Sequence, residues 1–78
     1  MDTHSATRMD QARVERLTRD LIAGYGLSME LVAVRHEAPR WEVTVRTASH
    51  RVITLEIPDT GSVADFRGWL KNLLIVEA

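Results

Sequence analysis

The sequence contains no cysteine, so no disulfide and no thiolate metal site can support its fold. It also lacks an apolar run of about 18 residues, so no transmembrane helix is predicted. Its N-terminal residues, MDTHSATRMD, include no apolar segment of the kind that a signal peptide needs. These absences together predict a cytoplasmic protein.

The chain also has little net charge and few aromatic residues. Its formal net charge of −1 argues against a general polyanion binder, because such proteins carry a basic excess. Aromatic residues make up 5% of the chain, which leaves few platforms on which single-stranded nucleic acid could stack. The three histidines, His4, His36 and His50, do not stand at metal-ligand spacing, so we expect no metal and no cofactor.

A chain of 78 residues forms one domain, and a core of this size supplies only about 3–5 kcal/mol. With no disulfide or metal, the remaining support would come from oligomerisation or a partner, although an unaided monomer is also possible. Nine of the ten basic residues are Arg. This bias favours a GC-rich bacterial or phage genome, with bidentate recognition of carboxylates or phosphates as the alternative explanation.

Two helices are predicted from apolar residues that recur every three or four positions. The first spans about residues 8–24, begins at a capping box formed by Thr7 and Asp10, and ends at Gly24 or Gly26. The second spans about residues 63–75 and begins at Ser62, with Asp65 three residues later. The apolar stripes consist of Val14, Leu17, Leu21 and Tyr25 in the first helix, and of Val63, Phe66, Leu70, Leu73 and Leu74, with Trp69 at the edge, in the second.

Three β-rich segments lie between the helices, at about residues 28–37, 41–47 and 51–57. We therefore expect an α+β fold of order α-β-β-β-α, with a three-stranded antiparallel meander and two helices packed on one face. Residues 1–7 are predicted to form a flexible N-terminal arm and residues 8–78 a single domain.

Two registers are open for the last two strands. In one, Val45 faces Ile53 and Glu42 faces Glu56, and residues 48–50 form a three-residue loop in which His50 would take the left-handed conformation. In the other, the pairing is shifted by two residues. Both registers keep the apolar residues on one face.

The strand over residues 28–37 carries apolar residues on both of its faces. Because neighbouring side chains point to opposite faces of a sheet, only one set can join the core. Either Val32 and Val34 or Met29, Leu31 and Ala33 then lie on the open face. We take Val32 and Val34, joined by Val52, as the candidate contact residues. The polar rim of this apolar centre would consist of Arg40, Glu42, Arg46 and Glu56, the arrangement that is typical of a protein contact. The alternative is that the N-terminal arm or the C-terminal residues IVEA cover this surface within the chain.

No catalytic constellation is apparent. Ser49 and His50 lie in a predicted turn with no acid to orient the histidine, and Glu42 and Glu56 lie on a flat sheet with nothing to desolvate them. We therefore expect no enzyme and no small-molecule substrate.

The α-β-β-β-α order is similar in topology to the double-stranded-RNA-binding domain. In that family the start of the second helix carries a lysine cluster that grips phosphates, whereas the corresponding segment here, DTGSVADFRGWLKN, begins acidic. The family's RNA-reading residues therefore cannot be carried over. A nucleic-acid surface would instead use the arginines of the first helix, Arg8, Arg13, Arg16 and Arg19, although Glu15 and Asp20 are spaced to pair with two of them.

The sequence thus favours a small non-catalytic protein-interaction module that acts by surface complementarity. It would be an inhibitor or adaptor that binds a larger protein complex or pairs with itself, as many small phage-encoded inhibitors do. The alternative is a weak nucleic-acid binder. Gly68, inside the second helix, is either a tolerated weakness or a point at which a partner's backbone comes close.

Overall fold

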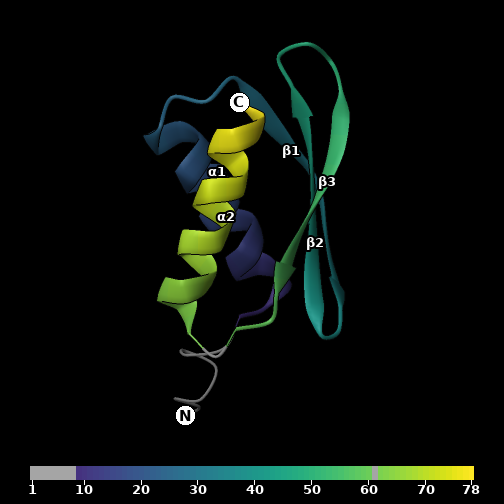
Figure 1. The fold of residues 1–78 in the computed structure, drawn as a ribbon, viewed down its shortest axis with the longest axis vertical. Helices are drawn as coiled ribbons and strands as arrows, with labels where there is room; N and C mark the ends of the chain where they lie inside the picture. The colour runs from purple at the N-terminus through teal and green to yellow at the C-terminus, as the bar shows by residue number, and fades with distance from the viewer. Residues whose placement is uncertain (1–8, 61) are drawn as a thin grey trace.

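The computed structural model describes residues 9–60 and 62–78 (Figure 1). Its elements are α1 (Gln11–Gly24), β1 (Met29–Glu37), β2 (Arg40–Thr47), β3 (Val52–Pro58) and α2 (Val63–Glu77). The order α-β-β-β-α is the predicted one. The expected flexible arm over residues 1–7 lies outside the described residues.

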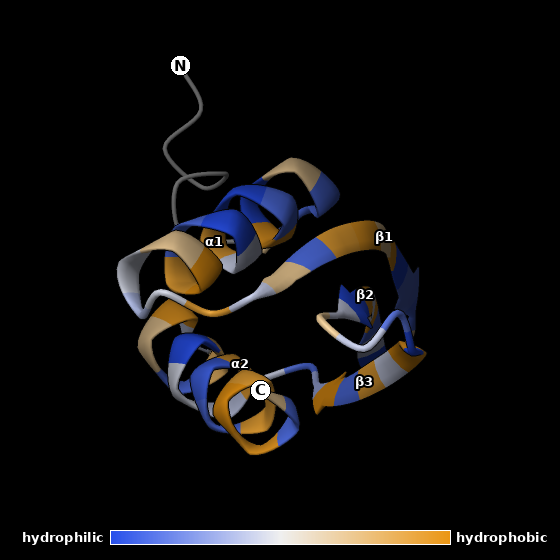
Figure 2. Cartoon of the chain, turned by 90° about the horizontal axis from the view of Figure 1, so that it is seen from above, coloured by the Kyte–Doolittle hydropathy of each residue, from blue (hydrophilic) through white to orange (hydrophobic). Residues whose placement is uncertain are grey.

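The three strands form one antiparallel sheet in the order β1-β2-β3, and both helices lie on the same face of it. Figure 2, which looks along the helices, shows α1 on the side of β1 and α2 on the side of β3. The core fills the space between the sheet and the two helices. Its buried side chains are Val14, Leu21, Val34, Trp41, Val43, Val45, Leu55, Ile57, Phe66, Leu70 and Leu74.

Helix α1 begins later than predicted. Its N-cap is Asp10, whose carboxylate accepts a hydrogen bond from the backbone N–H of Arg13 at 2.8 Å. Thr7, the expected cap, lies outside the described residues. Tyr25, predicted to join the apolar stripe, is about half exposed. The buried residue between Val14 and Leu21 is Thr18, whose hydroxyl donates to the carbonyl oxygen of Val14 at 2.7 Å and so is satisfied inside the core.

The end of α1 is a Schellman motif. Gly26 has a φ of 63°, the N–H of Leu27 donates to the carbonyl of Ile22 at 2.9 Å, and the N–H of Gly26 donates to that of Ala23 at 3.2 Å. Of the two glycines considered from the sequence, Gly26 is therefore the one that takes the left-handed conformation.

Helix α2 begins as predicted, because the Ser62 hydroxyl accepts a hydrogen bond from the backbone N–H of Asp65 at 3.0 Å. It continues to Glu77, so the segment IVEA, expected to be a short tail after the helix, is almost entirely helical. Val76 consequently occupies a defined position on the helix surface.

The first of the two registers is the one observed between β2 and β3. Val45 faces Ile53, Val43 faces Leu55 and Trp41 faces Ile57. The hairpin closes with the N–H of Thr47 donating to the carbonyl of Arg51 at 2.8 Å, and His50 has a φ of 67°. Both the three-residue loop and its left-handed histidine are therefore confirmed.

A β-bulge in β1 overturns the expectation for this strand. Leu31 faces Val45 and Ala33 faces Thr44, so Val32 has no partner on β2. The extra residue reverses the alternation of faces, which lets Leu31 and Val34 both turn towards the helices. Val34 is only 4% exposed and belongs to the core, so its predicted place on the open face is wrong.

Candidate functional site

The open face of the sheet is a network of ion pairs and hydrogen bonds. Arg46 Nη1 lies 3.2 Å from Glu30 Oε1, and the hydroxyls of Thr44 and Thr54 lie 3.0 Å apart at the centre of the face. Arg35 pairs with both Glu37 and Glu42. The predicted apolar centre is therefore absent from the described part of this face.

Of the three valines expected there, two are exposed but they lie apart. Val32 on β1 is 46% exposed and Val52 on β3 is 56% exposed, and β2 lies between their strands. The pairing across the sheet places Arg46 directly opposite Val52 and Glu30 opposite Arg46, so polar side chains separate the two valines.

The predicted rim residues are close to one another and pair among themselves. Glu42 and Glu56 are directly opposite, as the observed register requires, and Arg40 bridges them, with nitrogen–oxygen distances of 3.6 Å and 3.7 Å. The arginine therefore offsets the repulsion that two facing carboxylates would cause. The structure brings Arg40, Glu42 and Glu56 together, but around a polar centre, and Arg46 pairs separately with Glu30.

The arginines of α1 lie differently from expectation. Arg8 is outside the described residues, Arg16 and Arg19 are exposed, and Arg13 is partly buried. The anticipated ion pairs with Glu15 and Asp20 do not form, and within residues 9–60 and 62–78 no acidic oxygen lies within 4.0 Å of these three guanidinium groups. Glu15 instead accepts a hydrogen bond from the side chain of Gln11 at 3.1 Å.

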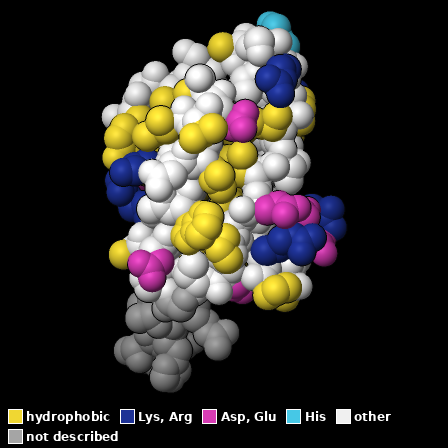
Figure 3. Space-filling view, viewed as in Figure 1, with side chains coloured by type: hydrophobic (Ala, Val, Ile, Leu, Met, Phe, Trp, Pro, Cys, Tyr) yellow, Lys and Arg dark blue, Asp and Glu magenta, His cyan; other side chains and the backbone are white. Residues whose placement is uncertain are grey.

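A second surface, formed by α2 and β3, was not anticipated from the sequence. On α2, Trp69 is 50% exposed and Val76 is 76% exposed, and Asn72 lies between them at helical spacing, so the three share one side of the helix. A shallow hollow of about 380 Å³ lies beside Trp69 and Asn72 and reaches Gly68. Figure 3, in the view of Figure 1 with α2 in front, shows hydrophobic side chains in an interrupted band over α2, with charged side chains around it.

The edge of β3 borders the same side of the molecule, as Figures 1 and 2 show. Within the described residues no strand pairs with this edge. The hydrogen bond between Thr47 and Arg51 sets the alternation along the hairpin, so the backbone N–H and C=O groups of Val52, Thr54 and Glu56 point away from β2. We call this edge, together with Trp69, Asn72 and Val76, the α2–β3 face.

The signals for this face were present but weak in the sequence. Trp69 stands at the margin of the apolar stripe, where a tryptophan is compatible with either core or surface. Val76 was placed in a tail because two apolar residues close to a chain end carry no periodicity. Which strand edge stays unpaired depends on the strand order. For a short meander that order can be predicted from the sequence only by assuming that consecutive strands are neighbours.

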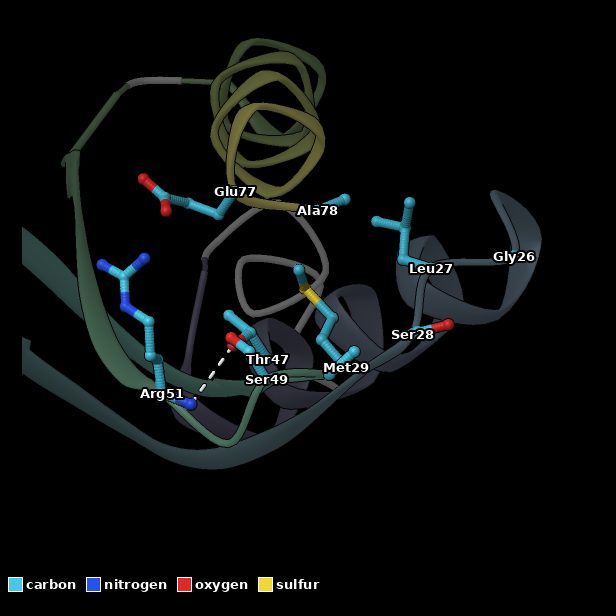
Figure 4. Close-up of a pocket in the computed structure, with 10 residues that line it drawn as sticks. Gly26, Leu27, Ser28, Met29, Thr47, Ser49, Arg51, Glu77 and Ala78 are labelled. Atoms are coloured by element: carbon cyan, nitrogen blue, oxygen red, sulfur yellow. Dashed lines mark hydrogen bonds between the residues drawn. The ribbon is translucent and has the colours of Figure 1, made fainter.

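A larger hollow of about 460 Å³ lies at the opposite end of the molecule from the β1–β2 turn (Figure 4). It is lined by the loop after α1, by the β2–β3 turn and by the end of α2, and Arg51 and Glu77 extend along its sides. The hydrogen bond drawn there, from the backbone N–H of Arg51 to the Thr47 hydroxyl at 3.2 Å, stabilises the turn.

The described residues also show how the histidines are used. His36 Nε2 lies 3.0 Å from Asp59 Oδ2, and its ring stacks on that of Trp41 with centroids 4.2 Å apart, so this pair ties the end of β1 to the segment after β3. Ser49 shares a hydrogen bond with Thr47 in the exposed turn rather than with His50. No group of three or more potential metal-binding side chains is found among residues 9–60 and 62–78.

Neither α1 nor α2, the helices of the described chain, combines the length and the apolar character that crossing a membrane requires. Comparisons with known protein families, with curated proteins and with solved structures found no match to this chain.

Proposed function

We propose that this protein is a non-catalytic interaction module that binds another protein or a second copy of itself through the α2–β3 face. The observation that carries the proposal is the exposure of Trp69 and Val76 on the same side as the unpaired edge of β3. Large exposed aromatic side chains often anchor protein contacts, and an apolar patch within a ring of charges has the anatomy of such a contact.

The open face of the sheet is less suited to this role. Its charged side chains already pair with one another, and burying them under a partner would remove their hydration without offering new partners. Glu56 differs in position, because it lies on the edge strand β3, where the Arg40 guanidinium reaches it from β2. There they form part of the polar rim of the α2–β3 face.

Such a module acts by surface complementarity, as an inhibitor or adaptor that occupies a site on its partner. A bacterial or phage origin belongs to the same proposal, supported by the preference for arginine, and so does a cytoplasmic location. The rigid core beneath α2 supports docking, because Phe66, Leu70 and Leu74 hold the helix against the sheet and fix the direction of its exposed side chains.

The test is site-specific photo-crosslinking from two matched positions. A benzophenone amino acid replaces Trp69 in one variant and Val32 in the other, since both side chains are about half exposed but only Trp69 lies on the α2–β3 face. We expect covalent protein adducts from position 69 and few from position 32. Equal capture from both positions, or capture from position 32 alone, would contradict the proposal.

A second function is favoured by one observation, the unpaired arginines of α1. Because Arg13, Arg16 and Arg19 have no acidic partner within the described residues, their charges remain available to phosphates. We propose weak nucleic-acid binding through α1 as the alternative. It predicts a gel shift at low salt that disappears steeply as salt rises and is lost in an Arg16→Glu/Arg19→Glu variant; no shift with any RNA or DNA would remove it.

A further inference from the structure

We propose that the occupant of the α2–β3 face is a second copy of this chain, with the two β3 edges paired antiparallel in one continuous sheet. The inference rests on the proposed function, because it uses the same face, and it names the partner. Its starting point is the difference between the two edges of the sheet.

The edges of natural sheets are protected against pairing by bulges, charges or short strands. β1 has such protection, because the bulge at Val32 breaks its regular ladder and Arg35 extends from it beside Glu37. β3 has no bulge: all seven of its residues are in regular register with β2, and its proline, Pro58, is the last residue. The β3 edge therefore remains a template for another strand.

The side chains favour one register for this pairing. If the two-fold axis passes beside Thr54, each Thr54 faces its own copy, and Val52 faces Glu56 of the second copy. Val52 then lies against the aliphatic part of the Glu56 side chain of the second copy. The hydrogen-bond ladder between the two β3 strands includes all three residues whose backbone groups point away from β2. An axis beside Glu56 would instead set two carboxylates against each other, which destabilises a strand pair.

The same axis also suits α2. Thr54 lies four residues before Pro58, a distance of about 13 Å along a strand. Because α2 starts near Pro58 and runs back along β3, about nine helical residues cover that distance, which brings Asn72 roughly level with the axis. Trp69 and Val76 stand three and four residues from Asn72, on either side of it. In an antiparallel pair of helices, Trp69 of each copy would therefore pack against Val76 of the other.

This arrangement places one polar residue, Asn72, at the centre of an apolar helix contact. A single asparagine at such a position can fix the register of paired helices, because other registers leave its amide without a partner. Specific interfaces bury at least about 1,200 Å² in total, and one strand pair with one helix pair makes a small contact by that standard. We therefore expect a dimer that dissociates on dilution.

The absence of cysteine makes thiol crosslinking a clean test. In the proposed dimer the two Thr54 Cα atoms are about 5.5 Å apart. The two Thr44 Cα atoms, one strand further from the axis in each copy, are separated by three strand spacings, about 14 Å. A bifunctional thiol reagent shorter than two strand spacings should therefore link Thr54→Cys into dimers and leave the matched control Thr44→Cys as monomers.

Light scattering across a dilution series of the native chain completes the experiment. We expect a mass approaching twice that of one chain at high concentration, a monomer for Trp69→Glu, and an unchanged dimer for Val32→Glu, with circular dichroism confirming that each variant is folded. A native chain that stays monomeric at all concentrations, or equal crosslinking of the two cysteine variants, would overturn the inference. If position 69 then photo-crosslinks to a different protein, the interaction function stands and only self-pairing is refuted; if position 69 captures nothing, both fail.

Discussion

Val34→Ala and Val32→Ala remove the same two methyl groups from β1, yet we expect very different costs. Val34 is 4% exposed and faces Val43 in the core, so the truncation removes buried apolar surface and leaves a cavity. At roughly 0.8 kcal/mol per buried methyl-sized group, with the cavity added, the expected loss is about 2 kcal/mol. Val32 projects from the bulge and is about half exposed, so its truncation should cost less than about 0.5 kcal/mol.

Urea unfolding measures both variants. Against a total stability of about 3–5 kcal/mol for a core of this size, Val34→Ala removes about half. With a slope near 1 kcal/mol per M, the midpoint should fall by about 2 M for Val34→Ala and hardly move for Val32→Ala. The slope of the unfolding free energy against urea concentration should be the same for the native chain and for both variants. Equal shifts of the two midpoints would refute the bulge, because a regular β1 would place Val32 and Val34 on the same face.

Three further substitutions, with Ser28→Ala as a control, test the helix ends and the glycine in the middle of α2. Ser62→Ala removes the acceptor for the Asp65 N–H and should lower the unfolding free energy by about 1 kcal/mol, whereas Ser28→Ala, at an exposed loop position, should leave it unchanged in the same urea titration. Gly26→Ala forces a β-carbon onto a residue with φ of 63° and should cost about 1–2 kcal/mol; an unchanged thermal midpoint would mean that the Schellman motif does not hold this conformation. Gly68→Ala should raise stability by up to about 1 kcal/mol, because a β-carbon there meets nothing within 4 Å, and if it also abolishes dimerisation in light scattering, the glycine serves close approach of a second chain.

The helices and the last two strands could be predicted because their signals are local. The cap of α2 depends on two residues three positions apart, and the buried faces of β2 and β3 follow from strict alternation within one stretch of the chain. The register between β2 and β3 stayed open, because two pairings keep the same apolar face. The start of α1 was placed too early because Thr7 and Asp10 both suit an N-cap, and a capping pattern alone does not choose between them. Tyr25 shows the same limit: its spacing fits the apolar stripe, but α1 ends at Gly24, and beyond that residue the spacing no longer determines which side it faces.

The candidate surface was mispredicted for a single physical reason. The sequence of β1 carries apolar residues on both faces, and β1 was interpreted as a regular strand. Strict alternation then leaves one of its two apolar faces outside the core. One bulge residue changes that consequence, because it turns Leu31 and Val34 to the same side and leaves Val32 and the small Ala33 outside. Bulges have no strong sequence signature unless they contain glycine, so the pattern MELVAVRHE could not by itself distinguish the two structures.

The bulge also explains why the α2–β3 face is the better candidate surface. By burying Val34 it satisfies the core without help from a partner on the open face, and that face is left to ion pairs that stabilise themselves. The same bulge interrupts the edge of β1, while β3 keeps a regular edge beneath a helix whose outer side carries Trp69 and Val76. The open backbone hydrogen-bonding groups of β3 and the exposed side chains of Trp69 and Val76 thus coincide on one side of the molecule. A partner that supplies both a strand and an apolar helix side would satisfy them together, and a second copy of the chain has both.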